Sequence, residues 1–204
     1  MSISTYAELK TAITNWSKRG DTLTVVDDFI DLAEADLWQN LRVKEMVTRA
    51  TASASTSDRY LALPTGFIDM RRLDLTSGGS TYNLAQVSPE ALKVIQGAGI
   101  PDSFSVGSQL TFNRIPDSSY TVEMVYYAKP TALSSSNTTN DVLTYYPTTY
   151  LYGALFHFAQ WAQDDEMLVK YSSLFDEAVK RANSFTKRGV HGPAPAMRTE
   201  APTP

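Results

Sequence analysis

The hydrophobic repeat of this sequence changes twice, and no other feature restricts the fold as strongly. Apolar residues recur every three to four residues up to about residue 42, alternate with a period of two over residues 44–130, and then return to the helical spacing. A helical repeat buries one stripe of a helix, whereas a period of two buries one face of a sheet. We therefore expect an α+β fold, with helices from both ends of the chain flanking a β segment.

Two amphipathic helices are predicted before residue 43. Thr5 and Glu8 have the spacing of a capping box at the start of the first helix, and Lys18-Arg19-Gly20 is typical of its end. The second helix should begin near Thr24. The apolar stripes of the two helices comprise Tyr6, Leu9, Ile13 and Trp16, and then Val26, Phe29, Ile30, Ala33, Leu37 and Leu41. Because the connection is short, the two helices should pack as an antiparallel hairpin.

Short strands joined by tight turns are predicted next. Strands are expected at residues 43–51, 59–63, 68–75, 81–84, 104–106, 109–112 and 120–127. The predicted hairpin turns are Ser57-Asp58, Gly78-Gly79 and Gly107-Ser108. One short helix should run from Ser88-Pro89-Glu90 to Gly97. In the last strand, one face should be buried, and it consists of Tyr120, Val122, Met124 and Tyr126.

Two further helices are predicted after Pro147 and after Asp164, the second with a stripe that includes Leu174, Phe175 and Phe185. An amphipathic hairpin cannot bury its stripe alone, so the two hairpins should form an antiparallel four-helix body. The predicted organisation is an N-terminal helical hairpin at 1–43, a mainly antiparallel β insertion domain with one short helix and an exit linker at 44–140, a C-terminal helical hairpin at 141–189, and a flexible extended tail at 190–204.

Composition excludes several classes of function. The chain has no cysteine and two histidines, His157 and His191, so neither a thiolate nor a multi-histidine metal site is expected, and no cofactor is predicted. The formal net charge of −4 lies entirely on the helical segments and argues against an open basic face that binds nucleic acid. No apolar run approaches the ~18 residues of a membrane span, and the first residues lack the pattern of a signal peptide.

No nucleotide-binding, zinc-protease or calcium-loop motif is present. His157 is expected on a helix surface or at an interface. Carboxylate pairs could serve a glycan-cleaving enzyme; the candidates are Asp27 with Asp28, Asp31 with Glu34, and the run Asp164-Asp165-Glu166. Helix capping explains the acidic run better, and a solvated helix face explains Asp31 and Glu34. We therefore expect no enzyme, with Glu34→Gln in a peptidoglycan turbidity assay as the test.

Tyrosine is concentrated near residue 150, at Tyr145, Tyr146, Tyr150 and Tyr152. On a helix, Tyr150 and Tyr152 lie about 200° apart, so they cannot both face one core. Tyrosines that a core does not need are enriched at protein interfaces. We predict that these four are interface aromatics, with a loop packing its own rings as the alternative.

Ordinary residues in a distinctive order carry a family resemblance. The relevant segments are Thr5-Tyr6-Ala7-Glu8-Leu9, Trp16 before Arg19-Gly20-Asp21, Asp28 through Arg42, and Tyr60 through Leu73 with its Tyr60, Leu63, Pro64 and Phe67. They resemble the opening helices and the Y-x-x-L-P-x-x-F strand of tailed-bacteriophage head-to-tail adaptors, also called connector or gatekeeper proteins. The resemblance extends through the C-terminal helices.

The resemblance implies a structural role in the virion. Adaptors of this kind form a dodecameric ring beneath the portal protein, extend the channel for genomic DNA, and carry the tail nozzle or tail-completion protein. It implies location at the head-tail interface after assembly in the host cytoplasm, and it transfers no catalytic residue. The C-terminal segment commonly reaches the portal, so Gly189–Pro204 is expected to dock there, with Met197 and Arg198 as anchors.

A ring of acidic subunits must turn part of its charge toward the lumen. A lumen that repels phosphates lets DNA slide during ejection, whereas a basic lumen would bind it. The candidate channel-facing acids are Asp27, Asp28, Asp31 and Glu34. The alternatives are another head- or tail-completion protein and, from other classes, a glycan-cleaving virion enzyme or a carbohydrate-binding module. The strand at 120–127 disfavours the last, because its second face is a poor stacking platform.

Overall fold

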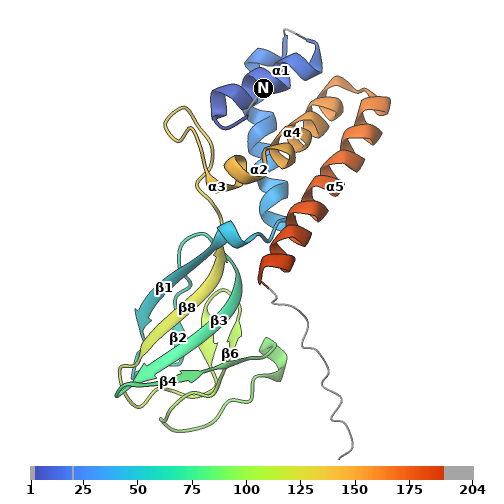
Figure 1. Ribbon diagram of the computed structural model, residues 1–204. Coiled ribbons are helices and arrows are strands. Elements are labelled where there is room, and N and C mark those ends of the chain that lie inside the picture. The colour runs from blue at the N-terminus through green and yellow to red at the C-terminus, as the bar shows by residue number, and fades with distance from the viewer. Residues whose placement is uncertain (1–2, 20, 191–204) are drawn as a thin grey trace, which may run out of the picture. The chain divides into compact units, whose positions relative to one another are not determined.

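The computed structural model describes residues 3–19 and 21–190, and their contacts divide into two compact units (Figure 1). The first, called here the helical unit, takes its residues from both ends of the chain, up to Lys44 and from Ala132 onward. The second, the β unit, is Glu45–Thr131. The predicted α+β fold is confirmed. The described residues end at Val190, so the predicted tail at 190–204 lies outside them except for its first residue.

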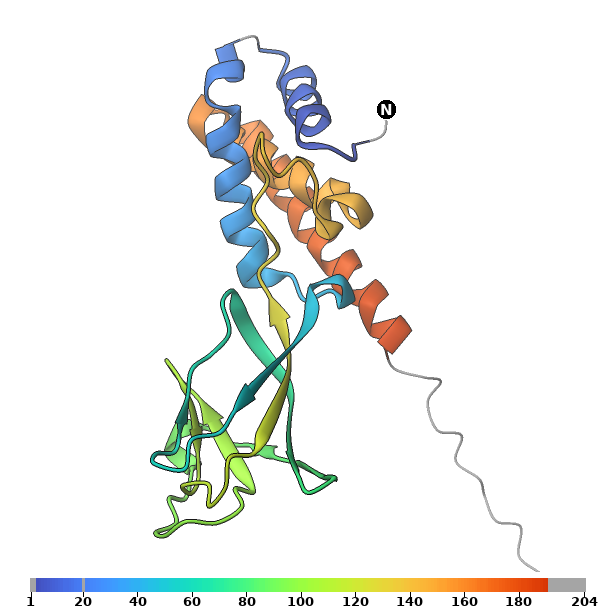
Figure 2. The ribbon, with the colours of Figure 1, turned by 90° about the vertical axis from the view of Figure 1, so that its left-hand side faces the viewer.

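The helical unit contains five α-helices within its described residues. They are α1 (Tyr6–Ser17), α2 (Val26–Asn40), α3 (Asp141–Tyr145), α4 (Pro147–Ala162) and α5 (Asp165–Val190), with a short 3₁₀ segment at Asp21–Thr24. Helix α4 is central, because it contacts α1, α2 and α5 (Figure 2). Helix α3 was not predicted, since five residues are too few to establish a hydrophobic period.

Local sequence explains how these helices begin, end and pack. The Thr5–Glu8 capping box is present, and Lys18, with a φ of 54°, takes the left-handed conformation that ends α1. The predicted stripe of α2 is buried throughout. Helix α4 lies very close to its neighbours at Gly153, where a Cβ atom would stand 3.0 Å from the Ala33 Cβ and from a ring carbon of Phe175.

The β unit contains two sheets around one core. The first has the order β1-β8-β3-β4 and is antiparallel; the second has the order β2-β7-β6-β5, in which β5 and β6 are parallel. The strands are β1 (Val47–Ser53), β2 (Tyr60–Leu61), β3 (Phe67–Ser77), β4 (Ser80–Asn83), β5 (Ala85–Gln86), β6 (Ser103–Val106), β7 (Leu110–Phe112) and β8 (Thr121–Ala128). The core includes Leu73, Phe104, Phe112 and the predicted buried face of β8.

Several local predictions are wrong in an informative way. The first strand starts at Val47 after a 3₁₀ turn at Lys44–Met46, and the predicted helix at Ser88 is a single 3₁₀ turn, Pro89–Ala91. Ser57-Asp58 closes no hairpin, because β1 pairs with β8 and β2 with β7. Pairing here follows burial in the shared core, which a local turn signal does not encode. The other two predicted turns do join paired strands, β3 with β4 and β6 with β7.

Candidate interaction surface

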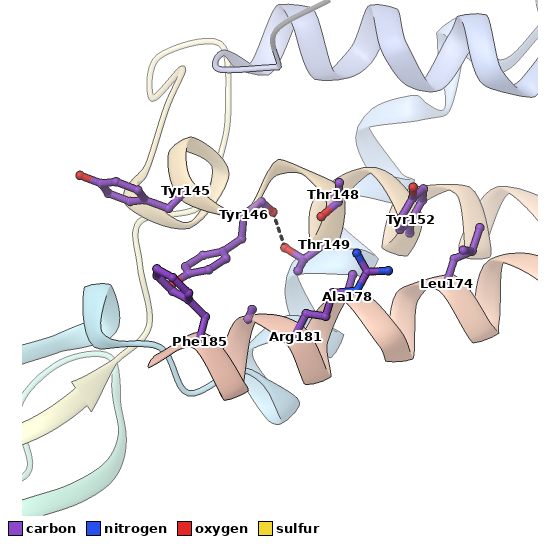
Figure 3. A pocket seen from close by; sticks show the side chains of 10 residues that line it. Tyr145, Tyr146, Thr148, Thr149, Tyr152, Leu174, Ala178, Arg181 and Phe185 are labelled. Atoms are coloured by element: carbon purple, nitrogen blue, oxygen red, sulfur yellow. Dashed lines mark hydrogen bonds between the residues drawn. The ribbon is translucent and has the colours of Figure 1, made fainter. Parts of the chain in front are cut away.

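A groove, called here the aromatic groove, lies between the start of α4 and the stretch of α5 from Leu174 to Phe185 (Figure 3). Its volume is about 240 Å³, and it is lined by Tyr145, Tyr146, Thr148, Thr149, Tyr152, Leu174, Ala178, Arg181, Ala182 and Phe185. Small-molecule sites typically measure about 300–1,000 Å³. The size and the mainly apolar lining therefore suit one or two side chains of another polypeptide segment better than a cofactor.

The corner between α3 and α4 positions the tyrosines of the aromatic groove. Pro147 occupies the first turn of α4, so the helix starts directly after Tyr146. The Thr149 hydroxyl donates a hydrogen bond of 2.7 Å to the Tyr146 carbonyl, which fixes the corner. Tyr145 is 63% exposed and Phe185 is 62% exposed. The single chain therefore leaves large parts of these rings in water.

Exposed aromatic surface continues from the aromatic groove onto α1. The ring centroids of Tyr152 and Trp16 lie 6.1 Å apart, and Trp16 is 47% exposed although its spacing predicted burial. Aromatic residues and arginine carry much of the binding energy at protein interfaces. The arrangement of Trp16, Tyr152 and the groove is therefore that of a docking surface.

Three of the four predicted interface aromatics line the groove, and the fourth does not. Tyr150 is fully buried, so its assignment as an interface residue is corrected. The predicted opposition of Tyr150 and Tyr152 on the helix accounts for this difference. Leu174 and Phe185 also line the groove, although their spacing predicts a place in the buried stripe of α5. Leu174 stands about 100° around the helix from the buried Phe175, and this offset is the signal that could have revealed the exposed edge.

Glu34 joins α2 to the C-terminal half of the chain inside the helical unit. Its Oε1 atom accepts hydrogen bonds from the Leu133 amide, at 2.9 Å, and from the Tyr150 hydroxyl, at 3.1 Å. The Asn140 side-chain amide donates to the same hydroxyl at 2.8 Å. Glu34 is 4% exposed, so its predicted place on a solvated face is corrected. Burial, together with the charge of Glu34, raises the pKa of Tyr150 well above its usual value.

The remaining acids of α2 differ in their contacts. Asp27 lies 2.6 Å from the Lys10 Nζ and accepts a 2.7 Å hydrogen bond from the Tyr6 hydroxyl. Burial opposes ionisation of Asp27, but the hydrogen bonds from Lys10 and Tyr6 prevail and lower its pKa. Asp28 and Asp31 are exposed on the same helix. These two are the acids of the predicted set that present their carboxylates to solvent most freely.

The other side chains considered for catalysis or metal binding, Asp164 and His157, make contacts that stabilise the fold. Asp164 caps α5, accepting a 2.9 Å hydrogen bond from the Met167 amide. The His157 Nε2 lies 2.9 Å from an Asp36 oxygen and links α4 to α2, while its side chain is 10% exposed. Within the described part of the chain, no three His, Asp or Glu side chains are grouped so that they could hold a metal ion. No described helix is both long and apolar enough to cross a bilayer.

Comparison with known proteins identifies the family. A family model for the SU10 adaptor protein matches residues 4–198, which is nearly the whole chain and includes every residue of the aromatic groove. No curated protein matches the chain. The family is one of structural phage adaptors, which implies a place in the virion and contacts with portal and tail proteins. The chain belongs to the SU10 adaptor protein family.

Proposed function

We propose that this protein is the subunit of a dodecameric ring that binds beneath the portal, extends the DNA channel and provides the platform for the tail. The family match supports the adaptor role, and the aromatic groove is the observation that carries the proposal. Half-exposed rings around a hollow are expected of a subunit whose surface is buried only on assembly. In this proposal α1, α2, α4 and α5 form an antiparallel ring body, and the β unit projects outward or toward the tail.

The acidic face of α2 is proposed to line the channel. Glu34 no longer belongs to it, and Asp27 is partly neutralised by Lys10, so the proposal depends chiefly on Asp28 and Asp31. Exposed carboxylates repel DNA phosphates and would let the genome slide through the ring. Charge reversal by Asp28→Lys with Asp31→Lys should slow DNA ejection, measured by fluorescence of released DNA. Unchanged ejection would remove these acids from the channel wall.

The C-terminal segment is proposed to anchor the ring to the portal. Met197 and Arg198 remain the proposed contacts, and both lie outside the described residues. Their substitution by alanine should weaken association with the portal while leaving the helical content of the free protein, measured by circular dichroism, unchanged. Assembly in the host cytoplasm and a function in DNA ejection belong to the same proposal.

The decisive experiment is to mix the protein with the portal ring of its own phage and to image the product by electron microscopy. Twelve-fold density below the portal is the expected result. A variant with Tyr145→Ala and Phe185→Ala should give incomplete rings, because both side chains are exposed and their loss leaves the fold intact. Tyr82→Ala, at an exposed tyrosine of the β unit, is the matched control. Failure of the unaltered protein to bind the portal would refute the proposal.

A further inference from the structure

The aromatic groove runs along the helix from which the C-terminal segment continues. Its α5 residues extend from Leu174 to Phe185, and the helix ends at Val190. At 1.5 Å per residue, Phe185 lies about 8 Å and Leu174 about 24 Å from that end. A second hollow of about 480 Å³ shares Arg181 and Phe185 with the groove and continues the concave surface along α5.

The segment that follows α5 has the composition that aromatic grooves bind. Residues 191–204 include Pro193, Pro195, Pro202 and Pro204, and Met197 follows the first two prolines closely. Proline-rich segments favour an extended polyproline II conformation, which loses little entropy when it docks on tyrosine and phenylalanine rings. Fourteen residues in this conformation span about 43 Å. The segment is therefore long enough to turn back and cover the whole groove.

Charge and connectivity also favour this occupant. The segment carries one Arg and one Glu, Arg198 and Glu200, and is neutral overall. At the rim of the groove, Arg181 forms an ion pair with Glu177 at 2.6 Å. The charges of this pair cancel, so the rim does not repel the neutral segment. A tethered segment has an effective concentration in the millimolar range, so even weak affinity for a small groove fills it. The same weakness allows a stronger partner to remove it.

We infer that in the unassembled protein residues 191–204 occupy the aromatic groove of their own chain. The consequence for assembly rests on the proposed function. When a portal ring captures the segment, the aromatic groove is vacated and becomes available to a neighbouring adaptor subunit. Ring formation then depends on the portal, because free subunits cover the surface through which they would associate.

The test is methyl NMR of the full-length protein labelled with ¹³C at its methionine methyl groups, with the Met197 signal assigned through Met197→Leu. The aromatic rings should shift this signal upfield and restrict its motion. Phe185→Ala should return the signal to the random-coil position with fast motion. Val169→Ala is the matched control, because Val169 is a 69% exposed residue of the same helix that does not line the groove, and it should change nothing.

A Met197 signal at the random-coil position in the unaltered protein, or one insensitive to Phe185→Ala, overturns the inference. A shift that disappears on dilution also overturns it, because a neighbouring molecule would then supply the segment. Portal binding is measured on the same samples. If the unaltered protein shows no upfield shift but binds the portal, the inference alone is rejected. If the unaltered protein shows the shift but does not bind the portal, the proposed function alone is rejected.

Discussion

The two units of this protein are held together in different ways. The β unit depends on continuous strand pairing around an apolar core, and its ion pair between Arg49 and Glu123 lies across the strands, with the Arg49 side chain 68% exposed. The helical unit has an apolar core as well, but single polar side chains also link its segments that are more than a hundred residues apart. Asn183 accepts from the Arg42 amide at 2.8 Å and donates to the Asn40 carbonyl at 3.0 Å. Removing one polar side chain should therefore lower the free energy of unfolding more in the helical unit than in the β unit.

The two units also differ in the charge and the exposed apolar residues of their surfaces. The helical segments carry all of the net charge, and the helical unit holds the aromatic groove. Exposed apolar residues of the β unit, such as Tyr60, Tyr82 and Val94, belong to separate segments. Scattered exposure of this kind is ordinary for a folded protein, whereas rings gathered around a hollow mark an interface. The difference assigns the proposed assembly contacts to the helical unit.

The largest effect is expected from Glu34→Ala. This change leaves the Leu133 amide and the Tyr150 hydroxyl buried without their acceptor, and each such loss costs about 1–3 kcal/mol. We expect the free energy of unfolding of the helical unit to fall by about 4 kcal/mol, measured by urea denaturation and followed by circular dichroism of the helices.

Asp31→Ala is the matched control on the same helix. Asp31 is exposed, and surface substitutions usually change stability by less than about 0.5 kcal/mol. Equal losses for Glu34→Ala and Asp31→Ala would mean that single buried polar contacts do not hold the helical unit together. The two units would then not differ in how much single polar contacts contribute to their stability.

Residues in long periodic segments could be predicted from the sequence, and residues whose environment depends on distant segments could not. The stripe of α2 and the capping box of α1 follow from local spacing, and both are confirmed. Glu34 has the spacing of a solvated acid, yet it is buried because Leu133, about a hundred residues later, brings a backbone donor to it. Phe185 has core spacing, yet it is 62% exposed and lines the aromatic groove together with Tyr145 and Tyr146, about forty residues earlier in the chain.

A smaller effect is expected in the β unit, at a turn whose stability depends on local backbone conformation. Gly79 has a φ of +83° in the turn between β3 and β4, a conformation that costs other residues roughly 1–2 kcal/mol. Gly79→Ala should therefore destabilise the β unit by about 1 kcal/mol in thermal unfolding.

Gly107→Ala provides the comparison within the same unit. Gly107 lies in the turn between β6 and β7, has no positive φ, and would place its Cβ no closer than 3.8 Å to Gln109. Gly107→Ala should therefore change the free energy of unfolding of the β unit by less than about 0.5 kcal/mol. If the two glycines responded alike, backbone conformation would not be what distinguishes these turns.

The smallest effect on stability appears only at alkaline pH. It depends on the raised pKa values of two tyrosines, one in each unit, and these values have different causes. In the β unit, the hydrogen bond from Tyr120 to Asp117 raises the pKa of Tyr120 to about 12, whereas burial is the main cause for Tyr150 in the helical unit. A raised tyrosine pKa means that the Tyr120 contact contributes stability fully below pH 10, which is lost as the pH rises through about 12.

Asp117→Ala should move the titration of Tyr120 back toward the ordinary value of about 10. Absorbance of tyrosinate near 295 nm then measures one additional group ionising between pH 10 and 12, and the loss of β-unit stability over that range should disappear. The buried Tyr150 depends on Glu34 and its own burial, so its titration should not respond to this change. A response of Tyr150 to Asp117→Ala would show that the two units do not titrate independently, because Tyr150 and Asp117 belong to different units.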